Sequence, residues 1–344
     1  MTHRFPIKEI AFQAGLSTAT IDRVLNQRPH VSPQTTARVV AAVAELKAQE
    51  AQLAARGRRM FFDFVIEAPT RFSREVQQAA EHVLTQVGAA ACRLRFVAQE
   101  IMDDADAANA LARIAKRGSQ GVCLKARDTP AIRTAVNALV AAGIPVVTLV
   151  TDIQASGRIA YVGLDNQSAG RTAAYLVATA LGKVTGTVLT IRSNDGFLGE
   201  EERETAFATT LAKSCPELRL IDVSGGSGVH YETSRLLDGV VDALHDLKAV
   251  YSMGGGNRTI LDILQKNRFQ PTIFIAHDLD QENRTLIEAG HLYFVLHHDL
   301  RADMHNVFQA FLHHHKLVPN GPTQTISNVQ VITPVNIPPL NQHF

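Results

Sequence analysis

A chain of 344 residues, 46% hydrophobic and 19% charged, has the composition of an ordinary folded protein and suits two or three domains. This balance excludes a largely disordered chain, and no apolar run reaches the ~18 residues of a membrane-spanning helix. The formal charge of +1 conceals an asymmetry, because residues 1–59 carry nine basic and four acidic residues and the remainder carries 25 and 29. A polyanion partner is therefore predicted for the basic head alone.

The chain starts MTHRFPIKEIAFQ, without the apolar core of a secretory signal, so we expect a cytoplasmic protein. Its three cysteines, Cys92, Cys123 and Cys215, lie far apart and lack the spacing of metal ligands. They are predicted to be buried thiols in a reducing compartment. No metal, cofactor or membrane partner is expected.

Residues 1–47 are predicted to form three helices. Apolar side chains recur at helical spacing at positions 7, 10, 11 and 14, then 21, 24 and 25, then 39, 40, 43 and 46, and the last four are predicted to form the inner face of the third helix. Gly15 separates the first two helices, Ser17 can cap the second, and Ser32 with Pro33 begins the third. Two short helices joined by a glycine turn and backed by a third form a helix-turn-helix, although a helical hairpin that caps the body would show a similar pattern.

The second of these helices suits contact with DNA. Its predicted exposed residues are Thr18, Ala19, Asp22 and Arg23. Small residues at the start of a helix let its backbone approach base edges, and Arg23 can donate two hydrogen bonds to a guanine. The short polar side chains suited to phosphate oxygens are Ser17, Asn26 and Thr35. The head is therefore predicted to bind double-stranded DNA.

The segment IKEIAFQAGLSTATIDRVLNQRPHVSPQTTARVVAAVAEL, residues 7–46, resembles the DNA-binding head of the lactose-repressor/galactose-repressor (LacI/GalR) family of bacterial transcription regulators. The similarity is continuous and includes the AG.S..T..RVLN core and the VSP.T start of the third helix. The resemblance implies that Thr18 and Ala19 read bases and that Arg23 contacts DNA. Asp22 departs from the family's usual serine. We expect it to shape operator choice, by accepting from a cytosine amino group or by pairing with Arg23.

The connector at residues 48–60 departs further from that family. Family members usually have Tyr-x-Pro-Asn there, followed by a hinge helix whose leucine inserts into the minor groove. This chain has AQEA at residues 48–51, and Gly57 falls where that leucine is expected. The Ala-rich sequence AQEAQLAAR still favours a helix. Leu53 could replace the leucine only if the register shifts, and Arg56 could contact phosphates.

From residue 61 onward, strand-like runs alternate with amphipathic stretches rich in Ala and Leu. The strand-like runs are at 61–68, 93–99, 121–126, 144–150, 187–193, 249–254, 272–277 and 293–298. The helical stretches are at 74–87, 105–117, 130–142, 167–181, 199–213, 232–247, 257–267 and 281–289. This alternation predicts an α/β body of two doubly wound parallel sheets with helices on both faces. Such a body resembles the effector domain of the same family and periplasmic sugar-binding proteins.

The predicted organisation is a helix-turn-helix domain at 1–47, a hinge at 48–60 and an effector-binding domain at 61–344. Within the last, one lobe is expected at about 61–166 and 296–323, and the other at about 167–295 and 324–342. The Pro-rich C-terminal residues contain no heptad pattern. A homodimer is therefore expected rather than a tetramer held by a coiled coil.

Candidate ligand-binding residues follow the predicted strands, where doubly wound sheets bind their ligands. They are Phe72, Thr151, Asp152, Arg203, Asn257, Asp278 and His298. Taken singly, each is better explained as a surface or capping residue than as a ligand contact. The family resemblance supports a ligand-binding role for Arg203, Asn257, Asp278 and His298. Val150 stands where sugar binders often have Asp, and Asp152 is the candidate to supply that carboxylate. The GGSG (225–228) and GGGN (254–257) segments are interpreted as turns rather than phosphate loops.

The sequence as a whole predicts a transcription regulator, specifically a repressor, controlled by a small sugar or polyol between two lobes. Arg203 would donate to hydroxyls, Asp278 and Asp152 would accept, Asn257 would do both and Phe72 would stack, a mixture that fits a neutral ligand better than a phosphorylated one. A homodimer would place two heads on a pseudo-palindromic operator. A periplasmic-type sugar receptor and a sugar-modifying enzyme are the alternatives. No catalytic constellation stands out, so enzymatic activity is not expected.

Overall fold

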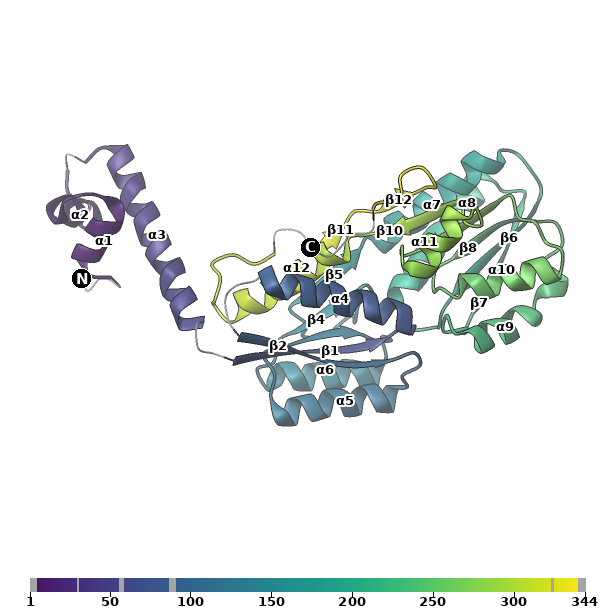
Figure 1. The fold of residues 1–344 in the computed structure, drawn as a ribbon, viewed down its shortest axis with the longest axis horizontal. Helices are drawn as coiled ribbons and strands as arrows, with labels where there is room; N and C mark the ends of the chain where they lie inside the picture. Colours follow the sequence, from purple (N-terminus) through teal and green to yellow (C-terminus); the bar gives the residue numbers. More distant parts are fainter. Residues whose placement is uncertain (1–4, 30, 56–58, 87–90, 323–324, 340–344) are drawn as a thin grey trace.

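The computed structural model describes residues 5–29, 31–55, 59–86, 91–322 and 325–339. Figure 1 shows a helical head set apart from a larger α/β body. Within the described part of the head, the chain forms α1 (Ile7–Ala14), α2 (Thr18–Leu25) and α3 (Pro33–Ala55). Gly15 ends α1 in the left-handed conformation, and the Ser17 hydroxyl accepts from the backbone N–H of Thr20 at 3.1 Å to start α2. The predicted helix-turn-helix is confirmed.

The head has a small core of its own. Ile10, Ile21, Val39 and Leu46 are buried in it. Val40 was predicted to face inward and instead is 63% exposed, because its neighbour Val39 occupies the inner face and the next residue on a helix points about 100° away. The predicted inner face of α3 is wrong at this position.

The connector begins as a direct continuation of α3. The helix runs to Ala55 without a break at residue 47, and the first strand of the body starts at Arg59. The helical tendency predicted for AQEAQLAAR therefore extends α3 rather than forming a separate element. The side chain of Leu53 and the whole of Arg56 lie outside the described residues.

The first lobe is built on a parallel sheet whose described strands follow the order β11-β5-β4-β3-β1-β2. These strands are β1 (Arg59–Glu67), β2 (Ala91–Gln99), β3 (Gly121–Lys125), β4 (Val146–Leu149), β5 (Ala160–Leu164) and β11 (Ile326–Ser327). One face packs on α4 (Thr70–Gln86) and α12 (Leu300–His314), and the other on α5 (Asp104–Arg117) and α6 (Pro130–Ala141). β3 and β4 are buried along their whole length, as strands covered on both faces must be.

The second lobe repeats this plan with the described order β12-β10-β9-β8-β6-β7. Its strands are β6 (Gly186–Arg192), β7 (Leu218–Ser224), β8 (Leu247–Ser252), β9 (Ile273–His277), β10 (Phe294–His297) and the antiparallel β12 (Gln330–Ile332). α7 (Asn166–Leu181) and α8 (Leu198–Ser214) cover one face. α9 (His230–Asp238), α10 (Asn257–Lys266) and α11 (Gln281–Glu288) cover the other. The predicted two-sheet α/β architecture is confirmed.

Three segments cross between the lobes in the part of the chain that the structure describes. The first lies between β5 and α7 at Asp165, the second between β10 and α12 at residues 298–299, and the third between β11 and β12 at residues 328–329. The last two come later than the expected residues 296 and 324, because β10 still pairs in the second sheet and β11 pairs with β5 in the first. No helix in the described ranges is long and apolar enough to cross a membrane.

Candidate functional site

The exposed side of α2 carries the residues predicted to meet DNA. Ser17, Thr18, Ala19, Arg23 and Asn26 are exposed. Asp22 and Thr35 are half-buried, and the backbone N–H of Thr35 is bonded to the hydroxyl of Ser32 at 3.1 Å. The head therefore offers one short polar face, with Arg23 in the last turn of α2.

Asp22 is held within the head rather than by Arg23. Its carboxylate accepts from the Asn26 side-chain amide at 2.7 Å and lies 3.3 Å from the Arg28 guanidinium. Of the two partners considered for Asp22, Arg23 is not the one that it contacts, because Asn26 and Arg28 follow one helical turn or more later and fold back over it. Arg28 thus partly neutralises the acid that departs from the family pattern.

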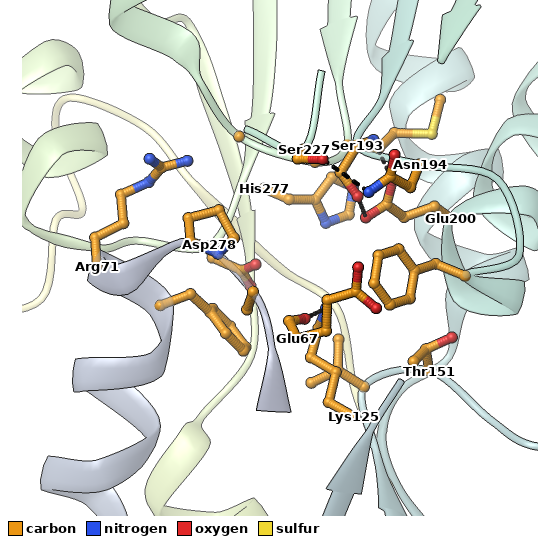
Figure 2. A pocket seen from close by; sticks show the side chains of 18 of the residues that line it. Glu67, Arg71, Lys125, Thr151, Ser193, Asn194, Glu200, Ser227, His277 and Asp278 are labelled. Atoms are coloured by element: carbon orange, nitrogen blue, oxygen red, sulfur yellow. Dashed lines mark hydrogen bonds between the residues drawn. The ribbon is translucent and has the colours of Figure 1, made fainter. Parts of the chain in front are cut away.

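A cleft opens between the two lobes, at the carboxyl ends of the strands in both sheets. This is where doubly wound sheets bind ligands. Figure 2 shows Glu67 and Asp278 directed into this cavity from opposite lobes. Of the residues predicted to bind a ligand, four line the cleft: Phe72, Thr151, Arg203 and Asp278.

Asp152 does not line the cleft, and the prediction that it supplies a carboxylate there is wrong. It lines a separate hollow near β5 and α12. Arg158 folds back onto both carboxylate oxygens, Thr148 donates to one of them at 2.7 Å, and the backbone N–H of Ile153 donates at 2.8 Å. The carboxylate is thus turned away from the cleft and already bonded.

Asn257 and His298 lie behind the cleft wall rather than on it. Asn257 is 1% exposed, and its amide donates to the Asn283 side chain, which does line the cleft. His298 is fully buried, with its Nε2 3.5 Å from the Asp278 carboxylate and its Nδ1 2.5 Å from Asp303. Both residues support the wall from behind, so their expected direct contact with a ligand is not seen.

The buried guanidinium of Arg203 is fixed from α8. Its Nε donates to the Asn166 side chain at 2.7 Å, and one terminal nitrogen contacts the Met253 carbonyl at 3.4 Å. A guanidinium has five N–H donors. The remaining donors give the second-lobe wall a cationic, hydrogen-bonding surface.

Two non-glycine residues at the cleft have strained backbones. Val150 and Asp278 both have φ of 64°. Val150 directly follows β4, and Asp278 directly follows β9. The Thr151 N–H bonds to the Leu149 carbonyl at 2.7 Å, which closes a γ-turn around Val150. Such strain is uncommon for a β-branched residue and tends to occur where a side chain or peptide must be aimed at a ligand.

The cleft also contains charged residues that the sequence analysis missed. Glu67 ends β1 and Lys125 ends β3; both are buried, and the Lys125 ammonium donates to the Glu67 carbonyl at 2.9 Å. Arg127 donates to one Glu67 carboxylate oxygen at 3.1 Å, while the other is buried without a partner among the described residues. Burial raises the pKa of Glu67, opposed by the nearby Arg127 and Lys125 charges. A charged residue at the end of an apolar run was the signal available in the sequence.

Aromatic rings from both lobes line the cavity, Phe72 from α4 in the first lobe and Phe197 at the start of α8 in the second. The Lys125 ammonium lies 4.1 Å from the ring centre of Phe197 and 5.9 Å from that of Phe72. Burial lowers the pKa of Lys125, although the neighbouring Glu200 and Glu67 charges oppose the shift. The cleft therefore combines apolar faces with carboxylate acceptors and cationic donors.

Arg71 joins the lobes at the edge of the cleft. It comes from α4 in the first lobe, and its Nε lies 2.9 Å from the Asp280 carboxylate in the second. Its guanidinium also reaches the Gly228 carbonyl at 3.4 Å, and a Cβ on Gly255 would lie only 2.0 Å from it. The GGSG and GGGN segments are loops that follow β7 and β8, and Gly228 and Gly255 pack against the Arg71 side chain. Within the described ranges, no group of His, Cys, Asp and Glu could hold a metal ion.

Two family models match the chain. One, described as bacterial regulatory proteins of the lacI family, matches residues 6–47. The other, described as a periplasmic binding protein domain, matches residues 65–302. The chain is a lacI-family regulator with a periplasmic binding protein domain. Among curated protein sequences, none matches it significantly.

The body of this lacI-family regulator is similar to solved sugar-binding proteins. GanP, a glucose-galactose binding protein from Geobacillus stearothermophilus, is 18% identical over 82% of this chain and 99% of its own, with a TM-score of 0.70. A solute-binding protein from Burkholderia graminis in complex with D-arabinose is 18% identical over 82% and 97%, with a TM-score of 0.72. One from Agrobacterium vitis bound to α-D-tagatopyranose is 18% identical over 80% and 95%, with a TM-score of 0.69. At these identities the likeness concerns the fold.

Proposed function

We propose that this lacI-family regulator is a cytoplasmic repressor whose DNA binding responds to a small neutral sugar or polyol in the interlobe cleft. The observation that carries the ligand class is the pairing of Arg203 donors with the Asp278 and Glu67 acceptors across a cavity that Phe72 also lines. A hydroxyl both donates and accepts, so it can satisfy both kinds of group at once. Among the proteins of similar fold, GanP binds glucose and galactose, and the other two bind D-arabinose and α-D-tagatopyranose.

We propose that the exposed face of α2 contacts DNA. Thr18 and Ala19 let the helix approach base edges, Arg23 donates to a guanine, and Ser17, Asn26 and Thr35 contact phosphates. One head covers a half-site, so we propose a homodimer on a pseudo-palindromic site. A ligand that changes the angle between the lobes would then change the spacing of the two heads. By reciprocity, the operator must change ligand affinity by the same factor.

The test begins with thermal unfolding against D-glucose, D-galactose, D-arabinose and D-tagatose, each compared with its phosphate or acid derivative. A ligand at ~100 times its dissociation constant adds ~2.7 kcal/mol to the free energy of unfolding. A double-stranded operator is then selected from a random library, and its affinity is measured with and without the stabilising sugar. Stabilisation by the anionic derivatives alone would contradict the neutral ligand, and DNA affinity unaffected by a bound sugar would contradict the regulatory role.

A variant control is available in Asp152→Asn. This carboxylate was predicted to bind the ligand, but it lies outside the cleft, bonded to Arg158. The variant should therefore keep the sugar response of the wild type. Loss of that response would return Asp152 to the ligand site.

A further inference from the structure

Asp303 connects two of the segments that cross between the lobes. It lies on α12 in the first lobe and is completely buried. One carboxylate oxygen is 2.5 Å from the Nδ1 of His298, on the second crossing. The other accepts from the hydroxyl of Ser327, the last residue before the third crossing. A single carboxylate therefore ties both crossings to the same helix.

The same group of residues reaches the ligand cleft from the second lobe. The free ring nitrogen of His298, Nε2, lies 3.5 Å from the carboxylate of Asp278. Burial opposes a charge on His298, but the hydrogen bonds and charges of Asp278 and Asp303 raise its pKa to about 10. The His298 imidazolium thus lies between two carboxylates. The Asp303 carboxylate belongs to the first lobe and lies behind the cleft wall, and the Asp278 carboxylate belongs to the second lobe and lines the cleft.

The first crossing is connected to the cleft in a parallel way. Arg203 donates to the side chain of Asn166, the residue that begins α7 directly after the crossing. Asn166 in turn donates to the Tyr161 hydroxyl at 3.1 Å and contacts the Val150 carbonyl at 3.4 Å, both in the first lobe. Each of the two charged second-lobe groups proposed to hold the ligand is therefore linked to a crossing segment, Arg203 by its hydrogen bond to Asn166 and Asp278 by its 3.5 Å approach to His298.

Resting on the proposed function above, we propose that Asp303 is a positioning residue that couples ligand binding to the angle between the lobes, and so to DNA affinity, without touching the ligand. A rotation of the lobes moves Asp278 relative to Asp303, and His298 must follow one or the other. A hydroxyl bound to Asp278 competes with His298 for that carboxylate. A ligand in the cleft thereby changes the contact between Asp278 and His298, which fixes the second crossing. The hydrogen bond between Ser327 and Asp303 transmits this change to the third crossing.

The test compares Asp303→Asn with the wild type, using the sugar of the four named above that stabilises the wild type most and its selected operator. Allosteric coupling is typically ~5–150-fold in affinity. In Asp303→Asn the change in operator affinity on adding the sugar should fall to less than ~2-fold, while the sugar's own dissociation constant, measured by calorimetry, changes by less than ~5-fold.

Asp63→Asn is the matched control for loss of a buried first-lobe carboxylate. Asp63 is 1% exposed and paired with Arg95 and Arg117, on β1 and away from the crossings. It should lower the melting temperature and leave the coupling intact. Ser327→Ala, which removes only the bond at the third crossing, should reduce the coupling partially and decides the matter if Asp303→Asn does not fold.

The outcomes separate the two proposals. If the wild type shows no sugar-dependent change in operator affinity, the proposed function is wrong and the role of Asp303 falls with it. If the wild type responds and both Asp303→Asn and Ser327→Ala respond equally, only the coupling role is overturned. Equal loss of coupling in Asp63→Asn would show that general destabilisation is the cause, and would likewise overturn it.

Discussion

The α2 helix of the head presents Thr18, Ala19 and Arg23 to solvent, whereas Arg203, Glu67 and His298 of the body are almost completely buried. The proposed DNA contacts of the head thus lie outside its small core, so they can change without disturbing the fold. In the body, Arg203 and His298, which face or support the cleft, also take part in contacts that join the lobes. We therefore expect DNA binding to be separable from structural stability in this protein, and ligand sensing to be inseparable from it.

We expect the largest effect to be that of pH on the stability of the body. The raised pKa of His298, about 10 against an ordinary 6.5, means that the folded state holds its proton more tightly than the unfolded state. Its stabilising contribution is present in full below pH 6.5 and is lost as the pH rises through 10. We expect the free energy of unfolding, measured in urea, to fall from pH 7 to pH 10. The decline should become shallower in His298→Gln, and parallel curves would refute the imidazolium.

Arg203→Ala should show that sensing and stability share residues in the body. The change leaves the buried oxygen of Asn166 without its donor, so the free energy of unfolding should drop by about 2–3 kcal/mol. The sugar-induced rise in melting temperature should disappear, while the folded variant still binds the operator. Arg219→Ala, at the edge strand β7, serves as the control. A normal sugar response in Arg203→Ala would place the ligand elsewhere.

Arg23→Ala should show the opposite behaviour in the head. Discrimination between the selected operator and a version with a substituted guanine should fall by ~1–3 kcal/mol, measured by fluorescence anisotropy. Because Arg23 is exposed, the free energy of unfolding should stay within ~0.5 kcal/mol of the wild type. Unchanged discrimination would remove Arg23 from base recognition, and a large loss of stability would contradict the separation of the two regions.

Arg71→Ala should give the smallest effect, because the bridge to Asp280 is partly exposed at the edge of the cleft, with 26% of the arginine side chain accessible. Loss of such a pair is worth ~0.5–1 kcal/mol, or a two- to fivefold weaker affinity for the sugar. Calorimetric titration measures this directly. A tighter affinity would mean that the bridge holds the cleft shut against the ligand instead of helping to enclose it.

Residues close together in the sequence account for the features that could be predicted from it. The head could be recognised because Gly15, Ser17 and Ser32 act on helices that begin or end beside them. The strands β5 and β7 were missed for equally local reasons. β5 is short and contains a glycine, and β7 lies at a sheet edge where polar residues interrupt the apolar pattern. The helix expected to run to residue 247 ends at Asp238, just before Gly239.

The sequence by itself determined the helix-turn-helix, the two-sheet body and the position of Asp278 at the end of a buried strand, because helix capping and hydrophobic periodicity are local properties. Only the tertiary structure decided which polar groups face the cleft. Asp152 does not face the cleft, because Arg158 folds back onto its carboxylate, and His298 lies behind Asp278. Glu67 and Lys125 meet in the cleft because parallel strands far apart in the chain end at the same edge. Hydrogen bonds between distant segments determine these arrangements, and no local pattern in the sequence records them.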